Sequence, residues 1–176
     1  KNVTVSNNTF YNCRIGVKLQ ELSGYTTPEI TGLSMTGNKI ISKHGAQKVI
    51  SGRLLANNFS TFGTINNNYY AKPMDGNPRF VSMVNTFTET ERDSASWRTY
   101  ASQDANSVFS KIQLQDEDSI RFYTNPTAAA VTYALNDTLV DVAGTKYNTS
   151  VTVPAYSSVV LWNDDAATYT PKLLGV

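Results

Sequence analysis

Four cationic residues form the group in this sequence whose types and spacing could carry out proton-transfer chemistry: Lys39, Lys43, His44 and Arg53. A Lys or His side chain can act as a general base, and an Arg side chain can neutralise a carboxylate on a substrate. The four residues fall on neighbouring copies of a repeat, so they could share one face. The competing interpretation is a solvated loop, because no cluster of carboxylates accompanies them in the repeats to hold a metal ion.

Carboxylates elsewhere in the chain are candidates for acid–base chemistry or for Ca²⁺ binding. Hydrolysis by paired carboxylates needs two Asp or Glu residues across a cleft. Glu21 and Glu29 fall in an expected long loop, and Asp75 falls in an expected turn. The acidic runs at residues 116–118 and 163–165 fall in expected loops, where such runs are more often solvated than bound to metal. The sequence therefore predicts no metal site, with Ca²⁺ as the open alternative.

Other catalytic patterns find little support. The stretch GLSMT, which begins at Gly32, lacks the second glycine and the following helix of a nucleophile elbow. A single His leaves little room for a catalytic triad, and no phosphate-binding glycine loop is present. The lone Cys13 excludes an internal disulfide and a Cys-based zinc site, so we expect a small core residue there. Asp104 and Ser107 in the stretch QDANS are expected to be turn and cap residues.

Composition favours an all-β chain. Of 176 residues, 40% are hydrophobic and only 16% are charged, and Asn, Thr and Ser replace the missing charge. These three residue types suit turns, strands and stacked polar ladders better than helices. The net charge of +1 is spread without a basic run, which argues against nucleic acid as a partner. No apolar run approaches the roughly 20 residues that a membrane span needs.

An Asn-anchored pattern recurs along the first part of the chain. Each copy has a hydrophobic residue, two small or polar residues, an Asn and then apolar or aromatic residues. The copies are VTVSNNTFYNC (residues 3–13), LSMTGNKIIS (33–42), RLLANNFSTF (53–62) and TINNNYY (64–70), with the shared Asn at Asn8, Asn38, Asn58 and Asn68. Strands at such spacing must stack on one another to bury their apolar faces, as in solenoid proteins. The last copy follows too closely to form a full turn of a coil, so it is either a second strand of the same turn or an irregular terminal one.

The shared Asn is expected at the corner between two sheets. Asn tolerates left-handed backbone angles and can bond its own backbone. Stacked from copy to copy, such side chains would bond one another and satisfy amide groups that are otherwise buried. Residues 21–32 and 43–47 are then expected to be loops of unequal length.

Three further segments follow the repeats. Pro and Gly crowd into AKPMDGNPRF (residues 71–80) and predict a boundary there. DSASWRTYASQD (93–104) is the only convincing helical signal, and a short helix there could cover the open end of a solenoid. Residues 119–162 contain short alternating strands that predict a small antiparallel sheet or half-sandwich. The expected units are therefore residues 1–80 (repeats), 81–118 (capping segment) and 119–176 (β-domain).

These segments together resemble the C-terminal end of bacterial right-handed parallel β-helix proteins of the polysaccharide lyase and glycoside hydrolase type. The likeness rests on repeats such as VSNNTFYNC, on NNNYYAKPMDGNPRF followed by SASWRTYASQDANSVF, and on the closing β-domain FYTNPTAAAVTYALNDTLVDVAGTKYNTSVTVPAYSSVVLW. It covers roughly residues 1 to 162. Ser102 stands where the family usually has Gly before Gln-Asp, and such solenoids usually have many more repeats, so the catalytic repeats could lie outside this chain.

The resemblance implies an all-β fold: the last turns of a right-handed parallel β-helix, a short capping helix and a small C-terminal antiparallel β-domain. It also implies a secreted or periplasmic bacterial protein whose partners are a polysaccharide and the remainder of a longer β-helix chain. Aromatic side chains could stack on sugar rings, and we expect Tyr25, Tyr69 and Tyr70 to contact the glycan.

Three functions are compatible with this likeness. The first is a non-catalytic C-terminal portion of a carbohydrate-active protein that helps to bind polysaccharide. The second is a complete catalytic unit in which Lys43, His44 and Arg53 act on an acidic polysaccharide, since a lyase of this type needs a base and a cation beside the uronate carboxylate. The third is a structural or adhesive repeat protein. The sequence favours the first, because architectural motifs are plentiful and a catalytic constellation is lacking.

Overall fold

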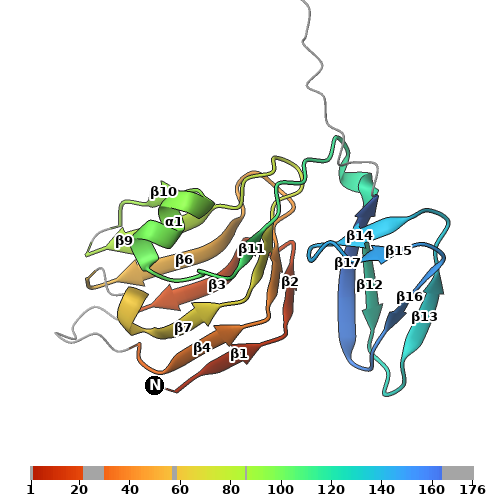
Figure 1. The fold of residues 1–176 in the computed structure, drawn as a ribbon. Helices are drawn as coiled ribbons and strands as arrows, with labels where there is room; N and C mark the ends of the chain where they lie inside the picture. The colour runs from red at the N-terminus through yellow and green to blue at the C-terminus, as the bar shows by residue number, and fades with distance from the viewer. Residues whose placement is uncertain (1, 22–29, 57–58, 86, 164–176) are drawn as a thin grey trace, which may run out of the picture.

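The computed structural model describes residues 2–21, 30–56, 59–85 and 87–163. The chain is mostly β, as composition predicts, and the described residues contain one α-helix (Figure 1). Two parts are evident: a stack of parallel strands up to residue 109, and an antiparallel β-domain from residue 120. No helix in the described ranges is long and apolar enough to cross a membrane.

The first part contains three sheets built from strands of successive repeats. The first sheet has β1 (Thr4–Ser6), β4 (Leu33–Thr36) and β7 (Gly63–Asn66). The second has β2 (Thr9–Tyr11), β5 (Lys39–Ile41), β8 (Tyr69–Ala71) and β11 (Val108–Phe109). The third has β3 (Ile15–Gln20), β6 (Lys48–Leu54), β9 (Phe80–Val84) and β10 (Thr90–Arg92). The chain visits the three sheets in the same order three times, and all these pairings are parallel except that of β10 with β9.

The repeat in the first two sheets has an interval of 30 residues. Val5 pairs with Met35, and Met35 pairs with Ile65, so that like residues stack along a column whose last two members are fully buried. Packing of such columns against one another forms the core of this part. Pairing in register is the reason why each short strand, which has little apolar surface of its own, is held in place.

Two expectations about the repeat are wrong. RLLANNFSTF is not a copy, because β6 ends at Leu54 and a 3₁₀-helix (Phe59–Thr61) follows; Asn58 itself lies outside the described residues. TINNNYY is a complete third copy that spans β7 and β8. The pattern of a hydrophobic residue, two small residues and an Asn is short enough to recur by chance, whereas a true copy also needs a strand on each side of the corner.

The asparagine ladder that stacking predicts is present at Asn8, Asn38 and Asn68. The backbone N–H of Asn8 donates to Oδ1 of Asn38 at 3.1 Å, and that of Asn38 donates to Oδ1 of Asn68 at 3.0 Å. The side-chain amides also bond from copy to copy, at 3.2 and 3.0 Å. The backbone N–H of Asn68 continues the series by donating to the hydroxyl of Ser107 at 2.9 Å.

The left-handed position at each corner is one residue earlier than we expected. The residues there are Asn7, Gly37 and Asn67, with φ of 56°, 68° and 54°. Asn and Gly are the residue types that adopt this conformation at the lowest cost. The ladder Asn thus has a different role from its neighbour: its side chain bonds adjacent copies while the preceding residue turns the chain.

Helix α1 (Ser94–Ala101) forms where predicted and covers the end of the stack (Figure 1). The carboxylate of Asp93 caps it by accepting from the backbone N–H of Ser96 at 2.8 Å. The fully buried Trp97 stacks on Phe80, with ring centroids 4.8 Å apart, and meets Phe59 edge-on at 4.9 Å. The parallel sheets extend past residue 80, the expected boundary, because β9 begins there and pairs with β6.

The second part is an antiparallel β-domain of two sheets, in agreement with the predicted strands. One sheet contains β12 (Ile120–Asn125), β17 (Ser157–Asn163), β14 (Leu139–Asp141) and β15 (Lys146–Tyr147); the other contains β13 (Val131–Ala134) and β16 (Ser150–Val153). Leu139, Val151 and Leu161 are among the buried residues packed between the sheets. A 3₁₀-helix, η2 (Glu117–Ser119), leads into the domain.

The two parts meet at an apolar seam. Side chains of β5 and β8 that point away from the core of the stack, Ile41 and Ala71, form one cluster with Val140, Val160 and Trp162 of the β-domain. All five residues are buried. Outward-facing apolar residues on a parallel sheet need such a cover, so the β-domain completes the burial that the stack cannot provide alone.

Candidate functional site

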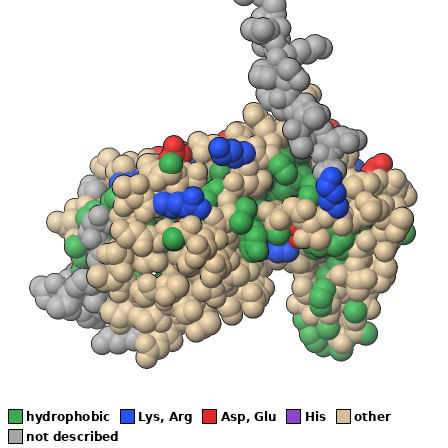
Figure 2. All heavy atoms as spheres, in the orientation of Figure 1, with side chains coloured by type: hydrophobic (Ala, Val, Ile, Leu, Met, Phe, Trp, Pro, Cys, Tyr) green, Lys and Arg blue, Asp and Glu red, His purple; other side chains and the backbone are tan. Residues whose placement is uncertain are grey.

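A cleft of about 590 Å³ opens beside the seam, between the corner of the first repeat and the β-domain. Figure 2 shows the molecule hollowed between these two parts. Eleven residues line it: Asn7, Asn8, Thr9, Phe10, Phe122, Thr124, Asn125, Pro126, Tyr156, Ser157 and Ser158. They come from the β1–β2 corner, β2, β12, β17 and the turns that follow β12 and precede β17, so that segments more than 100 residues apart in the sequence form the site.

The aromatic ring of Phe122 forms part of one wall. Alternation along β12 directs Ile120 and Phe122 toward the stack, where Ile120 is buried in the seam. Phe122 lies just beyond the seam and is 49% exposed. The ring of Tyr11 holds it from the stack side, with centroids 5.0 Å apart. An aromatic face that is fixed on one side and open on the other can stack on a flat apolar surface of a ligand.

Tyr156 supplies a second aromatic side chain from the turn between β16 and β17. Its side chain is 76% exposed, and its backbone has the left-handed φ of 51°, which bulky residues rarely adopt. The buried Asn125 fixes this turn, because its amide nitrogen lies within hydrogen-bond distance of the carbonyls of Val153 (2.9 Å) and Pro154 (2.8 Å). A strained backbone that the surroundings hold in place, with an exposed ring at its tip, is typical of functional sites.

Polar groups between the rings are available to a ligand. The side-chain hydroxyls of Thr9, Thr124 and Ser158 make no hydrogen bond to any other described residue. Thr124 and Ser158 are opposite each other on β12 and β17, and Thr124 is exposed. A hydroxyl can both donate and accept, so this row can bond ligand hydroxyl groups in either sense.

The predicted cationic group is divided in the structure. Lys43 and His44 both contact Glu117 of η2, at 3.0 Å from Nζ to Oε2 and 2.9 Å from Nδ1 to Oε1. The hydrogen bond to Glu117 raises the pKa of Lys43, and the same bond lowers the pKa of Glu117. Arg53 lies near the far end of β6, about 16 Å of strand beyond Lys48, and its guanidinium lies over the ring of Phe87. Lys43 and His44 are thus together, and Arg53 is not with them.

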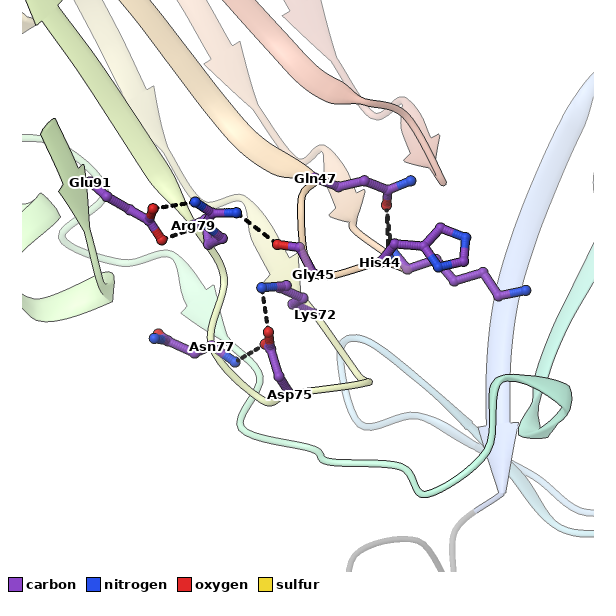
Figure 3. Close-up of polar contacts among 9 residues, drawn as sticks. His44, Gly45, Gln47, Lys72, Asp75, Asn77, Arg79 and Glu91 are labelled. Atoms are coloured by element: carbon purple, nitrogen blue, oxygen red, sulfur yellow. Dashed lines mark hydrogen bonds and ion pairs between the residues drawn. The ribbon is translucent and has the colours of Figure 1, made fainter. Parts of the chain in front are cut away.

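Neighbouring charges in the β8–β9 loop are paired with one another or with β10 (Figure 3). Arg79 forms an ion pair with Glu91, which raises the pKa of Arg79, and donates to the carbonyl of Gly45 at 2.7 Å. Lys72 pairs with Asp75, the carboxylate that the sequence placed in a turn. The bond from Arg79 to Gly45 joins the β8–β9 loop to the β5–β6 loop, and the ion pair with Glu91 joins it to β10. The described ranges contain no group of three or more His, Cys, Asp or Glu residues that could hold a metal ion.

The predicted glycan-contacting tyrosines do not line the cleft. Tyr70 is fully buried and its hydroxyl donates to Oδ1 of Asp104 at 3.0 Å, so the expectation that it contacts a ligand is wrong. Tyr70 points into the core because it stacks in the same column as Phe10 and Ile40. Tyr69 is half-buried against the seam. Tyr25 lies outside the described residues.

Asp104 is the centre of a buried hydrogen-bond network that the sequence did not predict. Its buried carboxylate accepts from Tyr70, from Nε1 of Trp97 at 2.9 Å and from the hydroxyl of Ser107 at 2.5 Å. Burial raises the pKa of Asp104 despite these donors. Asp104 begins a turn, as expected, because its carbonyl accepts from the backbone N–H of Ser107, and its carboxylate also ties the capping helix to the end of the asparagine ladder.

No family model, no curated protein and no solved structure matches the chain. An assignment of function therefore rests on the geometry of the cleft.

Proposed function

We propose that this chain is a non-catalytic, polysaccharide-binding portion of a secreted, carbohydrate-active right-handed parallel β-helix protein, and that the cleft holds the glycan. The observation that carries the proposal is the pairing of two exposed rings, Phe122 and Tyr156, with unbonded hydroxyls between the stack and the β-domain. The apolar faces of sugar rings stack on aromatic side chains, and sugar hydroxyls bond to Ser, Thr and Asn side chains.

The β-helix part of the proposal is supported by the order and register of the strands. The chain passes three times through the same three sheets, and in two of these sheets the paired strands are 30 residues apart. A coiled solenoid has this order and this regular spacing. Helix α1 covers the core at one end, as terminal caps of solenoids do. The remaining partner that we propose, a further turn of such a coil, is supported by features of the opposite end.

That opposite end presents unpaired strand edges and an apolar depression. In the described residues β1, β2 and β3 are each paired on one side only. A depression of about 400 Å³ there is lined largely by apolar side chains, including Val5, Val17 and Leu19. A stacked turn would pair the three edges and bury these side chains together, and both changes are favourable.

Binding is tested by titrating a panel of polysaccharides into the chain by isothermal calorimetry, with Tyr156→Gly as the diagnostic variant. Gly is the residue best suited to a φ of 51°, so this change removes the ring without harming the turn. We expect binding to weaken about 3- to 10-fold, the contribution of one aromatic stacking contact.

The matched control is Phe87→Ala. Phe87 is 78% exposed but does not line the cleft, so its removal should leave binding unchanged. Equal losses in the two variants, or a wild-type chain that binds none of the polymers, would contradict the proposal.

A further inference from the structure

We infer that the cleft takes an uncharged glycan segment and discriminates against polyuronates; the inference rests on the proposed function. The eleven lining residues include no Lys, Arg, His, Asp or Glu. Recognition of a uronate carboxylate in a protein site normally uses Arg or Lys, because desolvating a carboxylate without a cation is unfavourable. A cleft that offers only hydroxyls, amides and aromatic rings matches a neutral sugar.

A cation that flanks the cleft on the stack side, Lys39, is already engaged. Lys39 pairs with Thr9 across β2 and β5, so its side chain points outward beside the cleft. Its Nζ lies 3.1 Å from Oδ2 of Asp141, whose side chain is only 4% exposed. Diverting Lys39 to a ligand would leave that buried carboxylate without its charge partner, which is a large penalty.

The other nearby cations are also unsuited to ligand binding in the cleft. Lys43 is paired with Glu117 at the seam. Arg121 neighbours Phe122 on β12, but alternation along the strand directs its side chain to the opposite face of the sheet. None of these three cations is therefore available to a uronate in the cleft.

The geometry favours a chain of sugar rings over a single sugar. The ring of Phe122 projects from β12, and the ring of Tyr156 projects from the turn between β16 and β17. The hydroxyls of Thr124 and Ser158 lie opposite each other on the adjacent strands β12 and β17, between the seam and that turn. The volume of about 590 Å³ suits a few sugar residues, more than a single sugar would fill.

The test compares polymers that differ only in charge. Polygalacturonate and alginate are each titrated beside their carboxyl-reduced, neutral forms, together with a neutral glucan, xylan, mannan and galactan. We expect the tightest ligand to be neutral, carboxyl reduction to raise affinity about 10-fold or more, and binding to change less than about 2-fold between 20 and 500 mM NaCl, because no ion pair forms.

A gain-of-function variant tests the same point in the opposite direction. Thr124 is exposed and directed into the cleft, so Thr124→Lys places a cation beside Phe122 without disturbing a buried group. We expect this variant to bind polygalacturonate about 5-fold or more tightly than the wild type does, and in a salt-dependent manner. Failure of the lysine to improve uronate binding would overturn the inference that missing charge is the discriminating feature.

The outcomes separate the two proposals. Preferential, salt-sensitive binding of polyuronates that is still weakened in Tyr156→Gly would overturn the inference of a neutral ligand while the proposed function stands. Binding of none of the polymers would overturn both. Release of unsaturated products from either polyuronate, followed by absorbance, would overturn the non-catalytic assignment and favour the alternative in which Lys43 and His44 take part in chemistry.

Discussion

Truncation of Asn38 is the sharpest test of what holds the stack together. Its side chain is fully buried in the asparagine ladder. The amide nitrogen lies 2.8 Å from the carbonyl of Val5, 3.0 Å from Oδ1 of Asn68 and 3.2 Å from the carbonyl of Thr36. An amide has two hydrogens, so at least one of them is shared between two acceptors. Oδ1 in turn accepts from the backbone and side chain of Asn8.

The expected loss of stability in Asn38→Ala follows from these bonds. Two donated bonds and two accepted ones are removed, each with a net contribution of about 1 kcal/mol. Water can replace the bonds that involve Asn8, because Asn8 is exposed at the end of the ladder, but it cannot reach the partners in the interior. We therefore expect a decrease of about 2–4 kcal/mol in the free energy of unfolding.

The matched control is Asn8→Ala, which removes the same side chain at the exposed end of the same ladder. Its bonds to the carbonyl of Ser6 and to Oδ1 of Asn38 can be exchanged for water, so the loss should stay below about 1 kcal/mol. Asn38→Asp is a third arm: it keeps the volume and the acceptor but removes the donor and buries a charge, so it should be at least as destabilising as Ala.

Equilibrium unfolding in urea, followed by tryptophan fluorescence and far-UV circular dichroism, measures the three differences. Coincident transitions for the two probes would justify a two-state analysis. Equal losses in Asn8→Ala and Asn38→Ala would refute the reasoning, because the ladder would then contribute equally whether or not it is buried. A stability of Asn38→Asp close to wild type would refute it as well.

Three further predictions concern the backbone, the seam and the turn beside the cleft. Gly63→Ala should destabilise the fold by more than about 2 kcal/mol in the same urea assay, because φ at Gly63 is 135° and a Cβ atom there would lie 2.1 Å from the backbone oxygen of Leu33. The control is Gly45→Ala, where nothing lies within 4 Å of the added Cβ atom, and equal losses of stability in the two variants would contradict the argument. The hydrogen bond from Lys43 lowers the pKa of Glu117 below its ordinary 4.5, so the ion pair stabilises the fold above pH 4.5 and this stabilisation is lost as pH falls through the lowered pKa. Between pH 6 and 3 the melting temperature of Glu117→Gln should therefore fall less steeply than that of the wild type, and parallel curves for the two proteins would contradict this prediction. Tyr156→Gly should leave the melting temperature unchanged or raise stability by up to about 1 kcal/mol, because relief of left-handed strain is partly offset by the greater freedom of Gly in the unfolded chain; a loss above about 1 kcal/mol would show that the ring stabilises the turn.

Features set by local chemistry were predictable from the sequence. The bonds between Asn8, Asn38 and Asn68 follow from stacking identical polar side chains at a constant interval, which only requires that the copies be aligned. The helix over residues 94–101 begins at a capping Asp and places Trp97 on one face. The strands after residue 119 alternate between turn signals. In each case the residues that specify the element lie within it or recur at a fixed spacing.

Features set by orientation and docking were not predictable from the same information. Tyr69 and Tyr70 are adjacent, and only the register of β8 decides which of them enters the core. Lys43 and Arg53 seemed able to share a face because the extent of β6 between them was unknown. The cleft joins residues 7–10 to residues 122–158, and no local pattern states that these segments meet. Tyr156 nevertheless left a signal, namely an aromatic residue that follows a Pro at the start of a strand.

The strand that closes the seam also shapes the cleft, so the cleft is preformed. Ile120, Phe122 and Thr124 all face the stack from β12, and along this row the side chains change from buried to half-exposed to exposed. Their partners on β17 change in the same direction, from the buried Val160 to the partly exposed Ser158. Widening the cleft would require pulling the buried end of the same rigid strands out of the seam, which apolar burial opposes. A ligand in the cleft would therefore meet the ring of Phe122 and the strand hydroxyls already in position, and little of its binding free energy would be lost to ordering these groups.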